Sequence, residues 1–301
     1  MQKKMISRVS LLLAAVLLLG CFGFAQGLNW EGQTGALLTP FAYTASSNGK
    51  LLGKPEVSFH YLNGGSVIGN DYQFSVTEGI GKRFEVGFTQ SMSSTGDNAL
   101  AFLFNGGYSS VHGKLTLIPE NAAKTKWVPA IAVGSIGRFN NERVYWNAVG
   151  DTTTSKGTSG DFYFVATKTI TQIKGLPFVL SGGEKVTNSS IMGIAGQAAS
   201  KNGEQAWKGS AFGAAAFVVK GPAKSALIFG TEAVQQPKYL QPLGQDVSIP
   251  TSLSYFVRVV PHLEGSPLQV DAGLVQAAGR IADGVDIKAR HQFGMGISYH
   301  F

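Results

Sequence analysis

The amino-acid sequence predicts an all-β fold built from antiparallel strands. Stretches in which apolar and polar residues alternate with a strict period of two recur along the chain, for example at 72–77, 84–89 and 253–259. Turn signals that contain glycine separate these stretches, as in the Asn-Gly-Gly sequence at 63–65. The 39 glycines of the chain suit many tight turns and the closely packed wall of a curved sheet.

The first 25 residues predict a secretory signal peptide. Lys3, Lys4 and Arg8 precede an apolar run at 9–25 that ends in small residues, and cleavage after Ala25 fits this pattern. A permanent membrane anchor is the alternative, but the run is short for a span of about 20 residues. No later segment reaches about 18 consecutive apolar residues, so the sequence predicts no further transmembrane helix.

Cys21 is the single cysteine of the chain and lies inside this predicted signal. The preceding residues give the sequence LLGC, which resembles a bacterial lipobox, so Cys21 is a candidate for lipidation. An ordinary cysteine in the apolar run is the alternative. Removing the three signal charges lowers the formal net charge from +7 to +4, which is too mild to indicate nucleic-acid binding.

Residues 26–54 form an N-terminal segment that we expect to be an edge strand or a plug. Thr39-Pro40 interrupts any strand there, because proline cannot donate a hydrogen bond to an interior ladder. Residues 55–301 hold the remaining strands, about fourteen in number, with twelve to sixteen compatible with the pattern. The candidate strands are 55–61, 71–77, 83–90, 99–108, 110–118, 127–139, 161–170, 176–183, 189–197, 207–220, 225–234, 252–260, 268–274 and 293–301, with 144–149 doubtful and 34–39 as a further addition.

Two folds share this alternation: a soluble β-sandwich, with its apolar face inward, and a transmembrane β-barrel, with its apolar face toward lipid. Charged residues in the middle of strands favour the barrel, because they suit a wet interior. Trp127 and Trp207 stand where candidate strands begin, as in the aromatic girdle of a membrane barrel. Short and long connections alternate from residue 198 to the end of the chain, which is typical of such barrels, although the stretch 140–160 does not fit this rhythm.

The last nine residues, FGMGISYHF, add a resemblance. Phe293, Met295, Ile297, Tyr299 and Phe301 alternate with small or polar residues and end on an aromatic. This ending resembles the assembly signal of bacterial outer-membrane β-barrel proteins. The resemblance implies recognition by the barrel-assembly machinery and residence in the outer membrane, among its lipid and lipopolysaccharide.

A second resemblance lies in the N-terminal segment. Its pattern is similar to the start of the YjbH-type proteins, which are outer-membrane proteins linked to exopolysaccharide export; an edge strand and turn leading into the barrel is the alternative. The residues that carry this similarity are Gly32, Thr34, Gly35, Leu37, Leu38, Thr39, Pro40 and Ala42.

The sequence offers little catalytic chemistry. It contains no G-x-S-x-G elbow, no H-E-x-x-H zinc helix and no glycine-rich phosphate loop. Ser110 and His112 lie on one face of a candidate strand and are the nearest approach to a nucleophile and base. We therefore predict no enzyme, no cofactor and no metal site.

Charged residues in or beside candidate strands are predicted to face the lumen. There they would either set the ion preference of a pore or pair to fill a closed barrel. The candidates are Glu56, His60, Arg83, Glu85, Lys114, Arg258, Asp271 and Arg290. The sequence thus favours a passive channel or a component of transport or export. Three alternatives stay open: a structural or adhesion barrel with a filled lumen, a lipid-modifying barrel enzyme, and a secreted soluble sandwich.

Overall fold

The structure is a computed structural model of the 301-residue chain. The predicted signal peptide, including Cys21, and residues 99–106 of the candidate strand at 99–108 lie outside the described residues. The structure describes residues 27–47, 50–94, 96, 107–146, 152–173, 176–189, 191–193, 207–222, 225–236, 238–240, 246–248, 251–261, 267–276, 280–282, 285–286 and 290–301.

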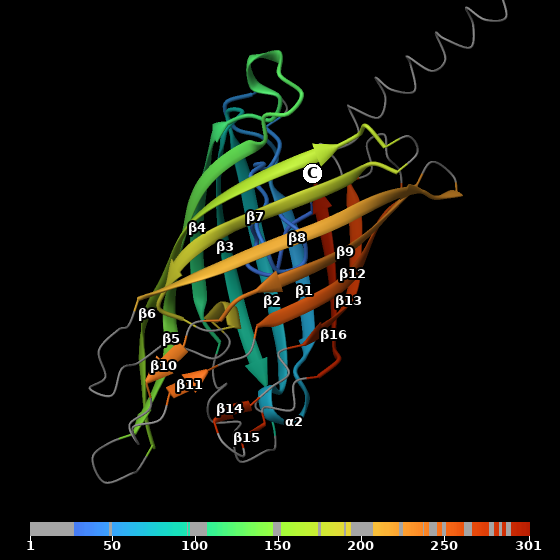
Figure 1. Ribbon diagram of the computed structural model, residues 1–301. Helices are drawn as coiled ribbons and strands as arrows, with labels where there is room; N and C mark the ends of the chain where they lie inside the picture. The colour runs from blue at the N-terminus through green and yellow to red at the C-terminus, as the bar shows by residue number, and fades with distance from the viewer. Residues whose placement is uncertain are drawn as a thin grey trace, which may run out of the picture.

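The described strands form one closed antiparallel barrel of twelve strands (Figure 1). The first and last strands close it, with Val57 opposite Tyr299 and Phe59 opposite Ile297. The barrel strands are β1 (Glu56–Asn63), β2 (Asn70–Ile80), β3 (Phe84–Ser94), β4 (Ser109–Ile118), β5 (Ala130–Trp146), β6 (Thr152–Ile170), β7 (Phe178–Thr187), β8 (Lys208–Lys220), β9 (Ala226–Val234), β12 (Ser252–Val260), β13 (Leu268–Gln276) and β16 (Gln292–His300). This architecture confirms the prediction of an all-β antiparallel barrel.

The two ends of the barrel differ. At one end, called here the turn end, connections such as 81–83 and 221–225 are short, and Phe301 lies there beside Pro55. At the opposite end, called the loop end, the connections are longer and carry small elements of their own (Figure 1). These elements are α2 (Gly65–Ile68), η3 (Ile191–Gly193), β10 (Lys238–Leu240), β11 (Asp246–Ser248), β14 (Arg280–Ala282) and β15 (Val285–Asp286), whereas η2 (Ala122–Lys124) lies at the turn end.

The barrel has twelve strands rather than the predicted fourteen. Residues 144–146 continue β5, so the doubtful strand at 144–149 and the expected long loop at 140–160 are largely one hairpin of two long strands. In the expected strand at 189–197, Ile191–Gly193 forms the 3-10 helix η3 instead. Period-two patterning selected these segments, but it cannot tell a new strand from the extension of an existing one.

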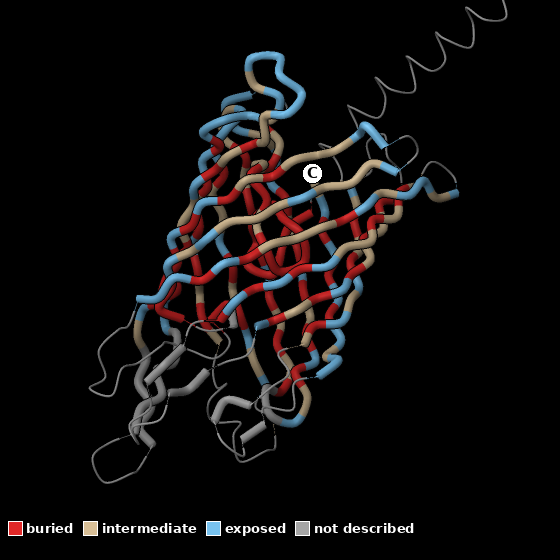
Figure 2. The backbone as a smooth tube through the Cα atoms, viewed as in Figure 1, coloured by how far each residue is buried: buried red, intermediate tan, exposed pale blue. Residues whose placement is uncertain are grey.

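Exposed and buried residues alternate along the barrel strands (Figure 2); the outward side chains are largely apolar, and many of the inward ones are polar. In β16 the side chains of Phe293, Met295, Ile297 and Tyr299 are 46%, 41%, 42% and 40% exposed, whereas Ser298 is 3% exposed. In this barrel the apolar side chains of every second position point outward. In a soluble sandwich the apolar faces of the two sheets point inward and are buried against each other. The arrangement therefore excludes the sandwich alternative.

None of the helices in the described ranges is long and apolar enough to cross a membrane.

The N-terminal segment lies inside the barrel (Figures 1 and 2). Residues 27–39 are buried without interruption, and the segment leaves the interior at the turn end, where it joins β1. We call residues 27–47 the plug. The core of the molecule is therefore an interface between the plug and the inner face of the wall.

Candidate functional site: a lumen closed by the plug

The plug is folded by its own backbone rather than by regular secondary structure. Isolated bridges join Leu28 to Thr34 and Gly35 to Pro40, and the side chain of Asn29 accepts hydrogen bonds from the backbone of Glu31. Gly35 is required by a close approach, since a Cβ there would lie 2.2 Å from the carbonyl oxygen of Thr39. These contacts turn the chain back on itself, which gives the plug a defined surface to present to the wall.

One part of the plug is apolar and packs on an apolar part of the wall. Plug residues Leu37, Leu38 and Phe41 are each at most 7% exposed and belong to one buried cluster with the wall. The wall residues of this cluster come from neighbouring strands of the barrel. They include Ala130, Ala132 and Ile136 of β5, Tyr163 and Val165 of β6, Phe212 and Ala216 of β8, Ile228 of β9 and Phe256 of β12. Burial of this surface drives the plug into the lumen.

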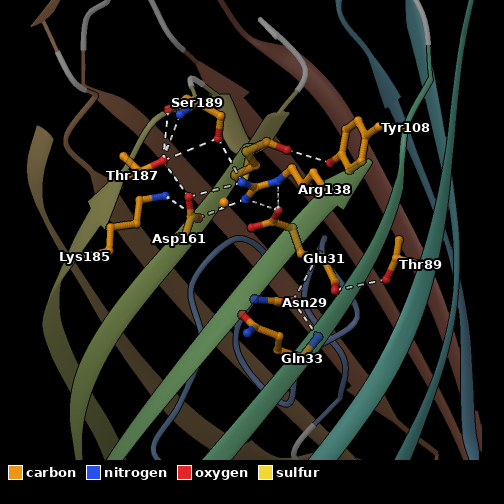
Figure 3. A network of polar contacts seen from close by, with 12 residues as sticks. Asn29, Glu31, Gln33, Thr89, Tyr108, Arg138, Asp161, Lys185, Thr187 and Ser189 are labelled. Atoms are coloured by element: carbon orange, nitrogen blue, oxygen red, sulfur yellow. Dashed lines mark hydrogen bonds and ion pairs between the residues drawn. The ribbon is translucent and has the colours of Figure 1, made fainter. Parts of the chain in front are cut away.

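The polar part of the plug is held by four charged groups of the wall, which we call clamps. The first clamp is Arg138 of β5, whose guanidinium binds the carboxylate of Glu31 in the plug (Figure 3). Arg138 Nε and Nη2 donate to the same oxygen of Glu31, at 2.9 and 2.5 Å. On its other side the guanidinium donates to both oxygens of Asp161 in β6, at 3.1 and 2.9 Å. This clamp thus ties the plug to two adjacent strands.

The second clamp is Glu85 of β3. Its carboxylate accepts hydrogen bonds from the backbone and hydroxyl of Thr34, and from the backbone N–H of Ala45. Lys114 of β4 forms an ion pair with Glu85 at 2.9 Å and also donates to the carbonyl of Thr34 at the same distance. Glu85 and Lys114 are both buried, so each charge depends on the other for compensation.

The third clamp is Glu232 of β9, which holds the turn before Pro40. Both of its oxygens accept the backbone N–H of Leu38, and Oε1 accepts the backbone N–H and the hydroxyl of Thr39. Ser254 of β12 donates to the remaining position on Oε2 at 2.5 Å. This buried carboxylate is thus stabilised by several hydrogen bonds, four of them from the plug.

The fourth clamp is Arg258 of β12, which binds plug carbonyls. Its guanidinium donates to the carbonyl oxygens of Gly35 and Ala36 at 2.9 and 3.1 Å. Two further bonds, at 2.6 and 2.9 Å, pair it with Asp271 of β13. The plug therefore supplies no charge here, and the ion pair remains within the wall.

Tyr43 fixes the plug where it leaves the barrel. Its hydroxyl lies 2.9 Å from Glu120 and 2.8 Å from Thr169, at the turn end. Burial raises the pKa of Tyr43, and the neighbouring carboxylate of Glu120 raises it further, so the phenol stays protonated and donates. The plug is consequently held along its whole length.

Six of the eight predicted lumen residues lie on the inner face. These six are buried; Glu85, Arg258 and Lys114 form hydrogen bonds to the plug, and the ring centroid of His60 lies 6.0 Å from that of Trp30 in the plug. The six residues are Glu56, His60, Glu85, Lys114, Arg258 and Asp271. The prediction needs correction for Arg83 and Arg290, which are exposed and lie outside the strands, in the β2–β3 turn and just before β16.

Sequence reasoning missed Glu31, Arg138, Asp161 and Glu232. The inner face of β5 before Arg138 carries Ala130, Ala132 and Ile136, so this strand shows no polar face from which an inward charge could be inferred. Glu31 stands in a segment without period-two patterning. Asp161 and Glu232 do alternate with outward apolar residues within their strands, and that signal could have found them.

Ser110 and His112 are both buried on the inner face of β4. No hydrogen bond joins them among the described contacts, and the nearest recorded charge to His112 is Glu85, at 3.8 Å. In the part of the chain that the structure describes, no group of three His, Cys, Asp or Glu residues gathers to hold a metal ion. The geometry thus offers no assembled nucleophile and base.

No family model and no curated protein sequence matches the chain. Among solved structures, the chain is similar to the NanC porin, with 10% identity over 82% of this chain and 100% of the porin, at a TM-score of 0.47. The KdgM porin matches with 7% identity over 82% and 99% of the two chains, at a TM-score of 0.44. The outer membrane protein Omp33 of Acinetobacter baumannii matches with 7% identity over 83% and 99%, at a TM-score of 0.43. Similarities this low transfer no function.

Proposed function

We propose that the chain is an outer-membrane β-barrel of the Gram-negative envelope that acts as a transport channel, and that the plug closes its pore. The observation that carries this proposal is the charged lining of the lumen. Its charges bind a segment of the chain that is not part of the wall. A barrel that served only as a scaffold could be filled by apolar side chains, which avoid the cost of burying charges.

The outward apolar face supports the membrane location. Exposed Phe, Leu, Val, Met and Tyr side chains cover the barrel strands, as the lipid-facing surface of a membrane barrel requires. The ending Phe293–Phe301 supports delivery by the barrel-assembly machinery, because its outward residues form the seam strand β16. Lipid and lipopolysaccharide are then the surroundings of the wall, after removal of the signal peptide.

The plug gives the channel a closed state. Leaving the lumen requires the plug to break its bonds to the four clamps and to re-expose its apolar residues. Removing one partner of a buried charge pair typically costs about 3–5 kcal/mol, so spontaneous opening is rare. We therefore expect transport to depend on conditions that release the plug rather than on an always open pore.

The N-terminal motif supports export as one direction of transport. In this chain Thr34 and Thr39 bind clamps, Gly35 forms the tight turn and Leu37 and Leu38 pack on the wall. The residues that resemble the YjbH-type proteins are thus the residues that hold the plug in place. We propose that the motif marks a plug, and that a link to exopolysaccharide export follows only if the transported solute is a polysaccharide.

Single-channel conductance in planar bilayers tests the proposal. The channel formed by the full chain is expected to be closed for most of the recording and to open only briefly. A variant with weakened clamps, such as Thr39→Val with Thr34→Val, should open more often while keeping the same open conductance. A structural barrel would give no openings in either protein, and that result would reject the channel in favour of the filled-barrel alternative.

A further inference from the structure

We infer that Arg138 is a carboxylate-binding site of the lumen, and that Glu31 of the plug occupies this site in the closed state. A solute with a carboxylate that reaches Arg138 from the loop end exchanges with Glu31 and thereby releases the plug. The inference rests on the proposed function, because it names the class of solute that opens the channel.

The first step is the geometry of the guanidinium. Asp161 binds one edge of Arg138 through both carboxylate oxygens, whereas Glu31 offers a single oxygen to Nε and Nη2 (Figure 3). A guanidinium edge matches a carboxylate best when two parallel bonds form, one to each oxygen. The edge that faces the plug is therefore not used in its best geometry, and a free carboxylate can form the bidentate pair that Glu31 does not.

The second step is charge. The Arg138 clamp contains two cations, Arg138 and Lys185, and two anions, Glu31 and Asp161, with Lys185 lying 3.4 Å from Asp161. When the plug withdraws Glu31, this clamp keeps one positive charge in excess. The other clamps do not, because the ion pairs of Glu85 and Arg258 lie wholly within the wall and Glu232 is an acid, which carries no positive charge. Of the four clamps, only the one at Arg138 would attract an anion.

The third step is access. Arg138 Nη1 donates to the hydroxyl of Ser189 at 2.8 Å, just after the end of β7. The hydroxyl of Tyr108 donates to the carbonyl of Met192, so the chain at 191–193 is fixed beside the same guanidinium. Met192 has a φ of 54° and Gly193 a φ of 86°, and a Cβ on Gly193 would lie 2.7 Å from Arg138 Cδ. These residues cover Arg138 from the loop end, where an external solute would arrive.

Met192 also makes this cover easy to displace. A residue other than glycine is strained in the left-handed region, and displacement of the cover would relieve that strain. The cover and the plug thus both contact the side chain of Arg138, from opposite sides. A ligand that binds Arg138 competes with both.

The experiment follows exposure of the plug by cysteine labelling. Ala36 is fully buried in the plug, and Cys21 is the chain's single native cysteine, so Ala36→Cys together with Cys21→Ser gives a protein with one reporter thiol. The full chain is reconstituted in liposomes and labelled with a membrane-impermeant maleimide. One sample contains glucuronate, and the other contains glucose as a neutral sugar for comparison. We expect glucuronate to accelerate labelling about tenfold and glucose to have no effect.

Variants in the reporter background locate the effect. Arg138→Gln should be labelled rapidly, and glucuronate should not change its labelling rate further. Arg138→Lys should respond only at a higher glucuronate concentration, because lysine lacks the pair of parallel donors with which a guanidinium binds a carboxylate. Thr39→Val is the matched control: it loosens the plug at Glu232, so labelling should rise while the response to glucuronate remains. If Arg138→Gln does not assemble into a barrel, the glucuronate response of Arg138→Lys tests the inference instead.

Two outcomes overturn the inference: equal labelling with glucuronate and glucose in the reporter protein, or an unchanged glucuronate response in both Arg138 variants. Conductance measured on the same preparations separates this failure from failure of the proposed function. If the channel opens but the frequency of opening does not change with glucuronate, the proposed channel is retained and the carboxylate site is rejected. Labelling that responds to glucuronate without any conductance keeps the site but rejects the channel.

Discussion

Glu232 accepts both the backbone N–H and the hydroxyl of Thr39 on a single carboxylate oxygen, each at 2.7 Å. These two residues lie 193 positions apart in the chain, one in the wall and the other in the plug. The pair shows that the wall recognises the backbone of the plug as well as its side chains. Four predictions concern this interface and the barrel around it.

Glu232→Gln should loosen the plug. The amide keeps one acceptor oxygen but lacks the charge that strengthens the bonds from Leu38 and Thr39, so plug seating should weaken by about 2 kcal/mol. The measure is the open probability in bilayers, which should rise about thirtyfold. Ser254→Ala is the control, since Ser254 contacts Glu232 but not the plug, and its effect should be small. Equal effects of the two variants would show that Glu232 acts within the wall alone.

Glu85→Gln should destabilise the whole protein rather than the plug alone. The substitution leaves the ammonium of Lys114 buried without its partner, at a cost of about 3–5 kcal/mol. Urea unfolding in lipid vesicles, followed by tryptophan fluorescence, measures the loss. The double variant Glu85→Gln with Lys114→Met should recover much of it. Additive losses would contradict the pairing of these two residues.

Gly35→Ala should prevent the tight turn of the plug. The added Cβ would lie 2.2 Å from the carbonyl of Thr39, so the chain between them must open and lose its bonds to the clamps. We expect frequent conductance from a barrel that still assembles. Gly209→Ala is the matched control, because nothing lies within 4 Å of a Cβ at that site. A silent Gly35→Ala channel would mean that the turn adapts.

Deletion of Phe301 tests the assembly signal. Phe301 packs edge-on against Tyr299 with ring centroids 5.0 Å apart, and its backbone N–H donates to the carbonyl of Pro55 beside the seam. We expect a severe loss of folded barrel in the outer membrane, measured by the gel shift between boiled and unboiled samples. Phe139→Ala, which removes an equally outward aromatic from β5, should retain the shift. A normal shift after the deletion would reject the signal.

Period-two patterning was sufficient to predict an antiparallel barrel wall, but not the number of its strands. In β16 and β12 every second side chain points outward to an apolar environment, and because the lumen is polar the two faces differ in sequence as well as in space. The same reasoning placed Glu85, Arg258 and Asp271 on strands. It could not place Arg138, because the plug presents apolar side chains to part of the wall and makes the inner face of β5 apolar as well.

For a related reason, the sequence could offer a plug only as one of two alternatives for residues 26–54 and could not predict how it folds. Its fold depends on partners that lie far along the chain, such as Arg138, which is 107 residues from Glu31, and Arg258, which is 223 residues from Gly35. A local pattern carries no information about such contacts. The motif from Gly32 to Ala42 could be noticed, but its meaning depended on a lumen whose lining was unknown.

The position of the plug ahead of β1 has a consequence for biogenesis. Residues 27–47 precede every strand of the wall, yet their hydrogen-bond partners are distributed from Thr77 in β2 to Arg258 in β12. Contacts between distant parts of a chain form late, after the loops between them have closed. We therefore expect residues 27–47 to remain without most of their partners until the sheet has curved around them. The pairing of β1 with β16 completes this enclosure, so the closing of the barrel is expected to determine also whether the plug is seated in the lumen.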